Sequence, residues 1–419
     1  MTSQSAEVFL RSLFDRAVEV ADPMRSLADY LPERPAGRLI VIGAGKASAR
    51  MAEAVEAAWG PCEGLVITRY GYGRPCQGIE IVEAAHPVPD AAGVDATRRM
   101  LGLIGGLGSD DLVLALISGG ASALLTAPIE GVSHAEKQAV NVALLSSGAP
   151  ISAMNVVRKH LSRVKGGQLS AAAFPARVHA LMISDIPGDD PAYIGSGPTV
   201  GDASTPEDAL AVLSKWNVEV PHSVITALRK GSGVIAPDDK CLSTTTNRIY
   251  AAPAQSLAAA AEMVQAAGYE VRVLGDALEG EAGELGREHA EMAIAISRVR
   301  GRWDAPLLLL SGGELTVTRR GDGIGGPNAE YCLALAIALE GAPGIHAIAR
   351  DTDGVDGAAD IAGAIIGPET LAKARKIGID PAAALASNDA HGFFGAIGDQ
   401  VITGPTMTNV NDFRAILIL

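Results

Sequence analysis

RLIVIGAGKASARMAEAVEAAW, residues 38–59, is the stretch that decides the fold class of this chain. Its first part is an unbroken apolar run that leads into a glycine turn, which is typical of a buried strand. Its second part is rich in alanine and long enough to form a helix. Fully apolar strands that alternate with helices indicate a mostly parallel sheet covered on both faces. The stretch therefore predicts an α/β fold.

Similar apolar runs recur along the chain, each stopped by glycine or polar residues. We expect strands in residues 64–69, 79–84, 111–118 and 178–185, and then in residues 269–275, 305–313, 345–354 and 399–404. Between the two groups, residues 221–239 are polar and rich in glycine and proline, which favours a linker. The sequence thus predicts two domains, residues 1–238 and residues 239–419.

The charge and the cysteines of the chain exclude several classes of protein. The formal net charge is -14, so we expect no nucleic-acid partner, because a phosphate backbone requires a basic face. The cysteines have no spacing typical of a zinc site, and reduced thiols are typical of a cytoplasmic protein; they are Cys62, Cys76, Cys241 and Cys332. The longest apolar runs are far shorter than the ~20 residues that span a bilayer, so we expect no membrane segment.

Three glycine-rich segments that follow predicted strands are candidates for binding an anion. In the first, Gly43, Gly45 and Lys46 combine a tight turn with a cation in front of a helix, which suits a phosphate group. The other two have Ser-Gly-Gly directly after a buried strand, where backbone N–H groups can surround an anion. Their candidate binding residues are Ser118, Gly119, Gly120 and Ser122 in one segment, and Ser311, Gly312, Gly313 and Glu314 in the other. The alternative interpretation is that all three are ordinary tight turns.

A basic cluster stands out in a chain that is acidic overall. The segment MNVVRKHLSRVKGGQLS, residues 154–170, is expected to be helical, with Arg158, Ser162 and Lys165 spaced to share one face. Arg158 is the candidate for binding a carboxylate, because a guanidinium can bind one through two hydrogen bonds. Asn155 lies in the same segment and is a further candidate for ligand binding. The alternative is a solvated helix face.

Carboxylates follow two of the predicted strands. Asp185 and Asp189 lie at the end of one strand and just past it, and Ser196, a candidate binding residue, follows in the same loop. Asp353 belongs to the run DTDGVDG, whose three carboxylates repel one another unless a cation compensates them. We expect Asp185, Asp189 and Asp353 to bind Mg²⁺, with Asp189 and Asp353 also candidates for activating a hydroxyl group. A capped helix start is the alternative for the DTDGVDG run.

Eight segments together resemble the class II glycerate 2-kinases, a family whose C-terminal half is called the MOFRL domain. The matching segments are VIGAGKA, SGGASALL, MNVVRKHLSRVKGG, SDIPGDDP with GSGPT, SGGEL, DTDGVDG, SNDAHGFF and TGPTMTNVND. They occur in the expected order through almost the whole chain. The resemblance therefore covers both predicted domains.

The resemblance implies an N-terminal Rossmann-like domain, a smaller C-terminal α/β domain of the MOFRL type and an active site in the cleft between them. The implied reaction is the ATP-dependent phosphorylation of D-glycerate to 2-phosphoglycerate, with Mg²⁺ as the divalent metal. Lys46 matches the active-site lysine of the family, and Asn328 and Asn409 join the candidate binding residues. The expected partners are glycerate and ATP, the expected location is the cytoplasm, and a homodimer is left open.

One departure from the family pattern concerns a cation. Where the family commonly has Gly-Gly-Arg-Asn-Gln-Glu, this chain has GGPNAE, residues 325–330, so that Pro327 replaces the arginine. Either another arginine supplies the charge, or the phosphoryl donor or the substrate differs. The candidate arginines are Arg158, Arg319 and Arg320.

An NAD(P)H-dependent hydroxypyruvate reductase is the alternative function. The turn at Gly43 and Gly45 favours it, as does Arg69, whose charge suits a 2′-phosphate. Against it, Ser48 stands where the dinucleotide fingerprint has its third glycine, and no acidic residue ends the strand at residues 64–69 to bind a ribose. A binding protein without catalysis is less well supported, because binding alone does not require so many carboxylates. We therefore expect a kinase.

Overall fold

The computed structural model describes residues 3–301, 303–357 and 359–419. The chain divides into two compact units. The N-terminal unit comprises Pro23–Ser184 and Asp189–Tyr250, and the C-terminal unit comprises the segments up to Asp22, Asp185–Gly188 and Ala251–Leu419. Each unit is built around its own six-stranded sheet.

This division differs from the predicted boundary between residues 238 and 239. The chain passes into the C-terminal unit after Tyr250, and helix α1 (Ser3–Ala21) also belongs to that unit. The boundary lies after residue 239 because strand β6 (Thr245–Ala251) belongs to the N-terminal sheet. Helix α1 joins the C-terminal unit because of its amphipathic pattern. Its buried face, which includes Leu10, Leu13 and Phe14, packs into a hydrophobic cluster with strands of the C-terminal sheet.

The sheet of the N-terminal unit confirms the predicted parallel α/β architecture. Its strand order is β3–β2–β1–β4–β5–β6. The strands are β1 (Leu39–Ala44), β2 (Glu63–Arg69), β3 (Ile79–Ala84), β4 (Leu112–Ile117), β5 (Arg177–Ile183) and β6 (Thr245–Ala251). All pairs from β3 through β5 are parallel. Every residue of β4 is buried, because a central strand covered on both faces has no side exposed to water.

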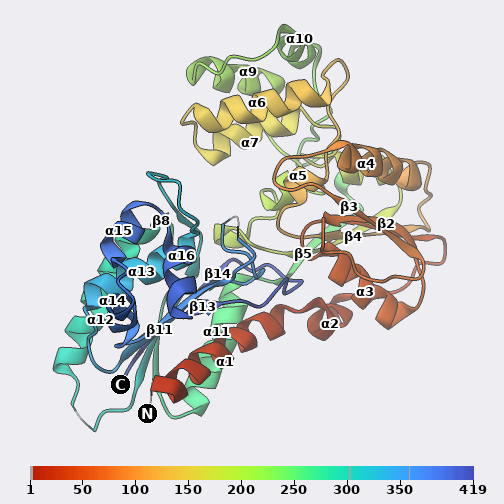
Figure 1. The fold of residues 1–419 in the computed structure, drawn as a ribbon. Helices are drawn as coiled ribbons and strands as arrows, with labels where there is room; N and C mark the ends of the chain where they lie inside the picture. The colour runs from red at the N-terminus through yellow and green to blue at the C-terminus, as the bar shows by residue number, and fades with distance from the viewer. Residues whose placement is uncertain (1–2, 302, 358) are drawn as a thin grey trace. The chain divides into compact units, whose positions relative to one another are not determined.

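Helices cover both faces of this sheet and also form a separate layer. In Figure 1, α3 (Ser48–Trp59) lies below the sheet and α4 (Ala91–Ile104) lies above it. Four further helices share a small hydrophobic core of their own (Figure 1). They are α6 (His134–Ser146), α7 (Ile151–His160), α9 (Pro206–Lys215) and α10 (His222–Lys230). The short helices α2 (Pro23–Ser26), α5 (Ala121–Leu124) and α8 (Gln168–Ala173) complete the unit.

The sheet of the C-terminal unit is mixed. Its strand order is β13–β12–β11–β14–β9–β7, with β7 parallel to β9 and the other pairs antiparallel. The strands are β7 (Glu270–Gly275), β9 (Leu307–Gly313), β11 (Ile345–Asp351), β12 (Gly363–Ile366), β13 (Gln400–Val401) and β14 (Asp412–Ile418). A small parallel pair is formed by β8 (Gly280–Glu281) and β10 (Leu315–Thr316).

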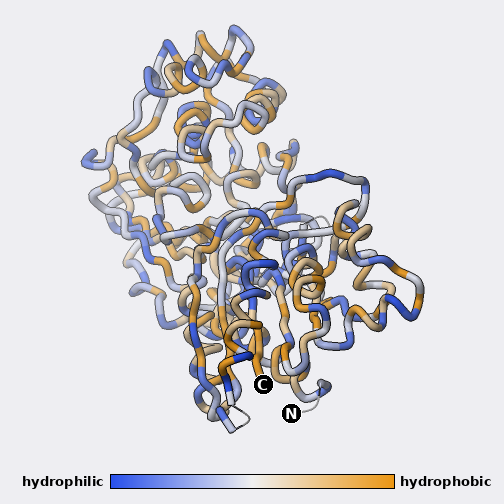
Figure 2. The backbone as a smooth tube through the Cα atoms, turned by 90° about the vertical axis from the view of Figure 1, so that its left-hand side faces the viewer, coloured by the Kyte–Doolittle hydropathy of each residue, from blue (hydrophilic) through white to orange (hydrophobic). Residues whose placement is uncertain are grey.

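Successive residues of the central strands face two different hydrophobic clusters. In β14, Phe413, Ala415 and Leu417 face the cluster that contains α1 and α11 (Pro253–Ala266). Ile416 and Ile418 face the opposite cluster, which contains α12 (Ala282–Val299) and α13 (Pro327–Leu339). The chain end marked C in Figure 2 is accordingly hydrophobic. Shorter helices at residues 370–397 are α14 (Thr370–Lys376), α15 (Pro381–Ala386) and α16 (Ala390–Ile397).

Two further features bear on the expectations from the sequence. Within the described residues, no helix is both long enough and apolar enough to cross a bilayer. All four cysteines are free thiols.

Candidate active site

The turn that contains Lys46 is held by hydrogen bonds inside the N-terminal unit. The N–H groups of Gly45, Lys46 and Ala47 donate to the Ile67 carbonyl, the Gly119 carbonyl and the Ser118 hydroxyl, respectively. A side chain at Gly43 or Gly45 would collide with β4 or Ser118, so both glycines are required by close packing. These three amides therefore have acceptors already.

The turn after β4 has backbone N–H groups without an acceptor among the described residues, which the turn at Lys46 lacks. Among the described residues, no acceptor is found for the N–H of Gly119 or that of Gly120. Gly120 has φ +83, and a Cβ atom there would lie 3.3 Å from the Cγ of Lys46 and 3.1 Å from the His86 ring. The stem of Lys46 thus lies beside two available backbone donors, at the carboxyl end of a parallel strand, where ligands bind in such sheets.

The predicted matching turn in the C-terminal unit is wrong. Ser311, Gly312 and Gly313 do not form a turn after a strand, because β9 continues through all three residues and pairs with β14, in agreement with the strand expected over residues 305–313. The carbonyls of Gly312 and Gly313 accept hydrogen bonds from the guanidinium of Arg414, at 2.9 and 2.8 Å. Glu314 follows and is exposed. The carbonyl groups of this segment are bound to a cation of the protein itself, and the segment is a paired strand and not a turn.

The predicted helix over residues 154–170 is wrong over residues 161–167, whereas residues 168–170 belong to the separate helix α8. Helix α7 ends at His160, because the Arg163 N–H donates to the Ala127 carbonyl (2.9 Å) in place of a helical acceptor. Ser162 and Lys165 therefore do not share a helix face with Arg158. Asn155 and Arg158 do lie on α7, three residues apart, and Asn155 is buried.

The three basic side chains of α7 have different surroundings. Lys159 donates to Asp202 (2.5 Å), and the ring nitrogens of His160 contact two serine hydroxyls, so both are structural. The Arg158 side chain is half-buried and has no hydrogen-bond or ion-pair partner in the part of the chain that the structure describes. Burial lowers the pKa of Arg158. Arg158 is thus the cation of α7 that is available to a ligand.

Lys165 was expected on the same basic helix face as Arg158, and the structure gives it different surroundings. Its ammonium group is fully buried and donates to the Ser122 carbonyl (2.8 Å), the Ser122 hydroxyl (3.0 Å) and the Gly195 carbonyl (3.3 Å). The Ser122 hydroxyl lies 2.8 Å from that of Ser196. Two predicted binding residues, Ser122 and Ser196, are therefore brought together by a lysine. The signal in the sequence was the lysine before two glycines, in KGG.

The predicted metal ligands fall into different parts of the structure. Asp189 belongs to the N-terminal unit, and its Oδ1 is buried without a hydrogen-bond partner among the described residues. Asp185 belongs to the C-terminal unit and accepts from the Asn409 amide at 2.9 Å. Asp353 is fully buried in the same unit and accepts from the Val355 N–H at 2.8 Å. The described residues contain no group of three or more His, Cys, Asp or Glu side chains that could hold a metal by themselves.

Asn328 lies in a buried polar network of the C-terminal unit. Its amide donates to Asp412 at 2.6 Å, and its backbone N–H donates to Asp356 at 2.9 Å. Arg414 donates to the other carboxylate oxygen of Asp412, at 2.6 Å. Burial raises the pKa of Asp412 to about 6. Pro327 precedes Asn328 as the first residue of α13, a position where the missing N–H of proline costs nothing.

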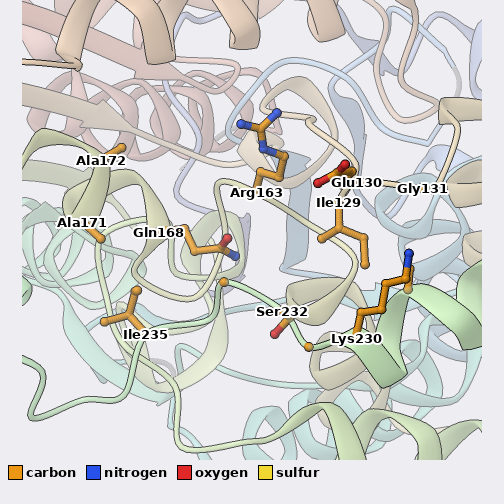
Figure 3. A pocket seen from close by; sticks show the side chains of 13 residues that line it. Ile129, Glu130, Gly131, Arg163, Gln168, Ala171, Ala172, Lys230, Ser232 and Ile235 are labelled. Atoms are coloured by element: carbon orange, nitrogen blue, oxygen red, sulfur yellow. The ribbon is translucent and has the colours of Figure 1, made fainter.

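A separate hollow of about 790 Å³ lies in the N-terminal unit, between the end of α10 and residues 129–131 and 163–172. Figure 3 shows the side chains of Arg163, Lys230 and Glu130 around it. These three residues are exposed, and none of the predicted site residues lines the hollow.

Comparison with known proteins gives matches over nearly the full chain. A family model described as "Domain of unknown function (DUF4147)" matches residues 9–229, and the MOFRL family model matches residues 307–412. A protein of Agrobacterium vitis named "Putative hydroxypyruvate reductase" is 50% identical over 99% of this chain and 95% of its own length. The D-glycerate 2-kinase of Thermotoga maritima is 39% identical over 96% of both chains. A crystal structure of glycerate kinase from Thermotoga maritima superposes with a TM-score of 0.89 at 37% identity, covering 99% of this chain and 100% of that one.

Proposed function

The chain belongs to the glycerate kinase family that combines the DUF4147 and MOFRL domains, and from this premise we propose that it phosphorylates D-glycerate at the 2-hydroxyl, with ATP as the donor. The product is then 2-phosphoglycerate, and the second product is ADP. Such a reaction asks the protein chiefly to align two anions and to stabilise the charge on the transferred phosphoryl group.

The observation that carries this proposal is the contact between Lys46 and the turn after β4. The lysine stem lies against Gly120, whose N–H, like that of Gly119, has no acceptor among the residues that the structure describes. A flexible ammonium group beside fixed amides is a suitable arrangement for phosphate oxygens, which accept several hydrogen bonds at once. We assign the phosphates of the nucleotide to this place.

The carboxylate of glycerate requires a second cation, and Arg158 meets the requirement. Its guanidinium is half-buried and has no partner among the described residues. A planar guanidinium binds a carboxylate through two parallel hydrogen bonds, which would fix the orientation of the acid. Asn155 lies three residues earlier on the same helix and offers an amide to a hydroxyl group of the substrate.

Mg²⁺ fits this reaction as a partner of the nucleotide. Mg²⁺ in kinases is bound by one or two carboxylates together with substrate phosphates, so a complete cage of protein ligands is not required. Asp189 suits this role best, because one of its oxygens is buried without a partner among the described residues. When bound, the ion neutralises charge on the phosphates. Asp185 and Asp353 already accept hydrogen bonds from Asn409 and Val355, and their metal-binding roles stay predictions.

A hydroxypyruvate reductase is less well supported by the geometry. The dinucleotide fingerprint uses free amides in the turn after the first strand, but the amides of Gly45, Lys46 and Ala47 are occupied. Arg69, the candidate for a 2′-phosphate, lies over the ring of Tyr72 at 5.4 Å. We place the reaction in the cytoplasm, because all four cysteines are free thiols.

Two assays on the purified full chain decide between these functions. In the first, ADP release is measured with ATP, Mg²⁺ and D-glycerate, and the product is identified by phosphorus NMR as the 2- or the 3-phosphate. In the second, oxidation of NADH and NADPH is followed with hydroxypyruvate. We expect ADP release that depends on D-glycerate, with the 2-phosphate as the product. Oxidation of NADH or NADPH without ADP release would overturn the proposal.

A further inference from the structure

Lys137 lies in a buried environment that is unusual for a lysine. It lies in the first turn of α6, its side chain is only 5% exposed, and its Nζ atom is buried without a hydrogen-bond partner among the described residues. Burial lowers the pKa of Lys137 to about 8. A buried ammonium group without a partner costs folding free energy, so natural chains retain one only where something else requires it.

Other buried lysines of this chain have partners that account for them. Lys159 has the Asp202 carboxylate, and Lys165 has three oxygen acceptors from Ser122 and Gly195. Within the described part of the chain, Lys137 has neither a carboxylate nor an acceptor. A purely structural role therefore does not explain it.

The basic side chains around Lys137 have fewer carboxylate partners than positive charges. Burial lowers the pKa of Lys165 well below its usual value, and the charges of three nearby cations, Lys137, Arg158 and Lys159, lower it further. Lys137, Arg158 and Lys159 are thus each within electrostatic reach of Lys165. The only ion pair that they make in the described part of the chain is the one between Lys159 and Asp202. Three cations remain without a counter-charge, which are Lys137, Arg158 and Lys165.

We propose that Lys137, Arg158 and Lys165 form a subsite for an oxyanion group of a ligand, with the hydroxyls of Ser122 and Ser196 beside it. Ammonium and guanidinium groups bind carboxylate and phosphoryl oxygens through charge-assisted hydrogen bonds, and a ligand of this kind compensates the buried positive charge. Lys137 supplies a donor that has no other use. Arg158 supplies a planar guanidinium that can form two parallel hydrogen bonds. Lys165 holds Ser122 in place by hydrogen bonds and adds a second ammonium charge to the subsite.

The occupant is either the carboxylate of the acid or a phosphoryl group of the nucleotide, and this assignment rests on the proposed function. The subsite itself does not, because it follows from burial and missing partners. Its binding properties can therefore be measured without turnover.

The test compares the wild type with Lys137→Met, which keeps the length of the side chain and removes its charge. The matched control is Lys230→Met, which removes an exposed lysine from the end of α10 in the same unit. Binding of D-glycerate, of inorganic phosphate and of a non-hydrolysable ATP analogue is measured by calorimetry, and the Tm of each protein is measured with and without each ligand.

We expect Lys137→Met to raise the Tm of the free protein and to weaken binding of at least one of the three ligands by tenfold or more. Loss of affinity for D-glycerate alone would place the carboxylate in the subsite, and loss for the ATP analogue would place a phosphoryl group there. Lys230→Met should bind like the wild type. Unchanged affinities for all three ligands, or a wild type that binds none of them, would overturn the inference.

Two further comparisons keep the inference separate from the proposed function and from folding defects. If Lys137→Met does not fold, Arg158→Gln must give the same loss of affinity, or the subsite is refuted. Weaker binding of phosphate to Lys137→Met in a protein that shows no kinase activity would support the subsite and refute the function. Kinase activity and affinities equal to the wild type in Lys137→Met would refute the subsite and leave the function intact.

Discussion

The backbone N–H of Lys46 donates to the carbonyl of Gly119 at 2.8 Å. This hydrogen bond joins the turn after β1 to the turn after β4. The two strands are parallel neighbours in the sheet. The hydrogen bond also explains why a lysine and a Ser-Gly-Gly segment more than seventy residues apart in the sequence lie side by side. The bond uses only backbone atoms, so the side chain of Lys46 can be replaced without breaking it.

We therefore expect Lys46→Met to fold like the wild type and to lose about 100-fold in the rate of 2-phosphoglycerate formation, which is the usual effect of removing one charge-stabilising group. The measurement is ADP release with D-glycerate at saturating ATP, with circular dichroism as the check on folding. Lys230→Met is the control. A loss of less than about tenfold in a folded Lys46→Met protein would contradict the role given to this lysine.

Gly120→Ala tests the contact between the two turns. Gly120 and Gly131 have almost the same backbone, with φ +83 and φ +84, but a Cβ at Gly131 meets nothing within 4 Å. Both substitutions should therefore cost about 1 kcal/mol of unfolding free energy, because an L residue is strained at this φ. Only Gly120→Ala should also lower kinase activity, since its methyl group presses on Lys46 and His86. Equal activity in the two variants would show that the contact does not matter.

The fold of the N-terminal unit could be predicted from the sequence because its strands are central and parallel. Both faces of such strands are covered, so they appear as apolar runs, and each run from residues 64–69 to 178–185 contains an observed strand. The structure also brings together two predicted site segments, Lys46 and the Ser-Gly-Gly turn after β4. Their roles in binding stay predictions, which rest on the rule that ligands bind at the carboxyl ends of such strands.

The C-terminal sheet was harder to predict because its central strand carries charges. β14 was not expected, since Asp412 and Arg414 interrupt the apolar run, although they are buried and compensate each other. Arg414 also explains the error at Gly312 and Gly313, whose carbonyls it binds. Lys137 could not be found, because one lysine in an amphipathic helix is ordinary in sequence and unusual only once its burial is known.

Removing Arg414 should be costly. Arg414→Met would leave the fully buried carboxylate of Asp412 with the Asn328 amide but without its cation, and breaking a buried pair typically costs about 3–5 kcal/mol. The measurement is urea unfolding of the full chain. Arg98→Met is the control, because the pair of Arg98 with Asp95 is exposed on α4 and should contribute less than about 1 kcal/mol. Similar losses in both variants would contradict the account of the network.

The lowered pKa of Lys137 predicts a specific dependence of stability on pH. In the unfolded chain a lysine titrates near 10.5, whereas burial lowers the pKa of Lys137 in the folded protein to about 8. Between these two values the unfolded state binds more protons than the folded state, so the free energy of unfolding rises with pH through this window. The full difference corresponds to about 3 kcal/mol.

Because other groups titrate alike in both proteins, the quantity to measure is the difference in unfolding free energy between Lys137→Met and the wild type. This difference should favour the variant most below pH 8 and shrink as the pH approaches 10.5. A difference that stays constant over that range would mean that Lys137 is solvated or paired in the folded protein, and the argument for a buried oxyanion subsite would fail with it.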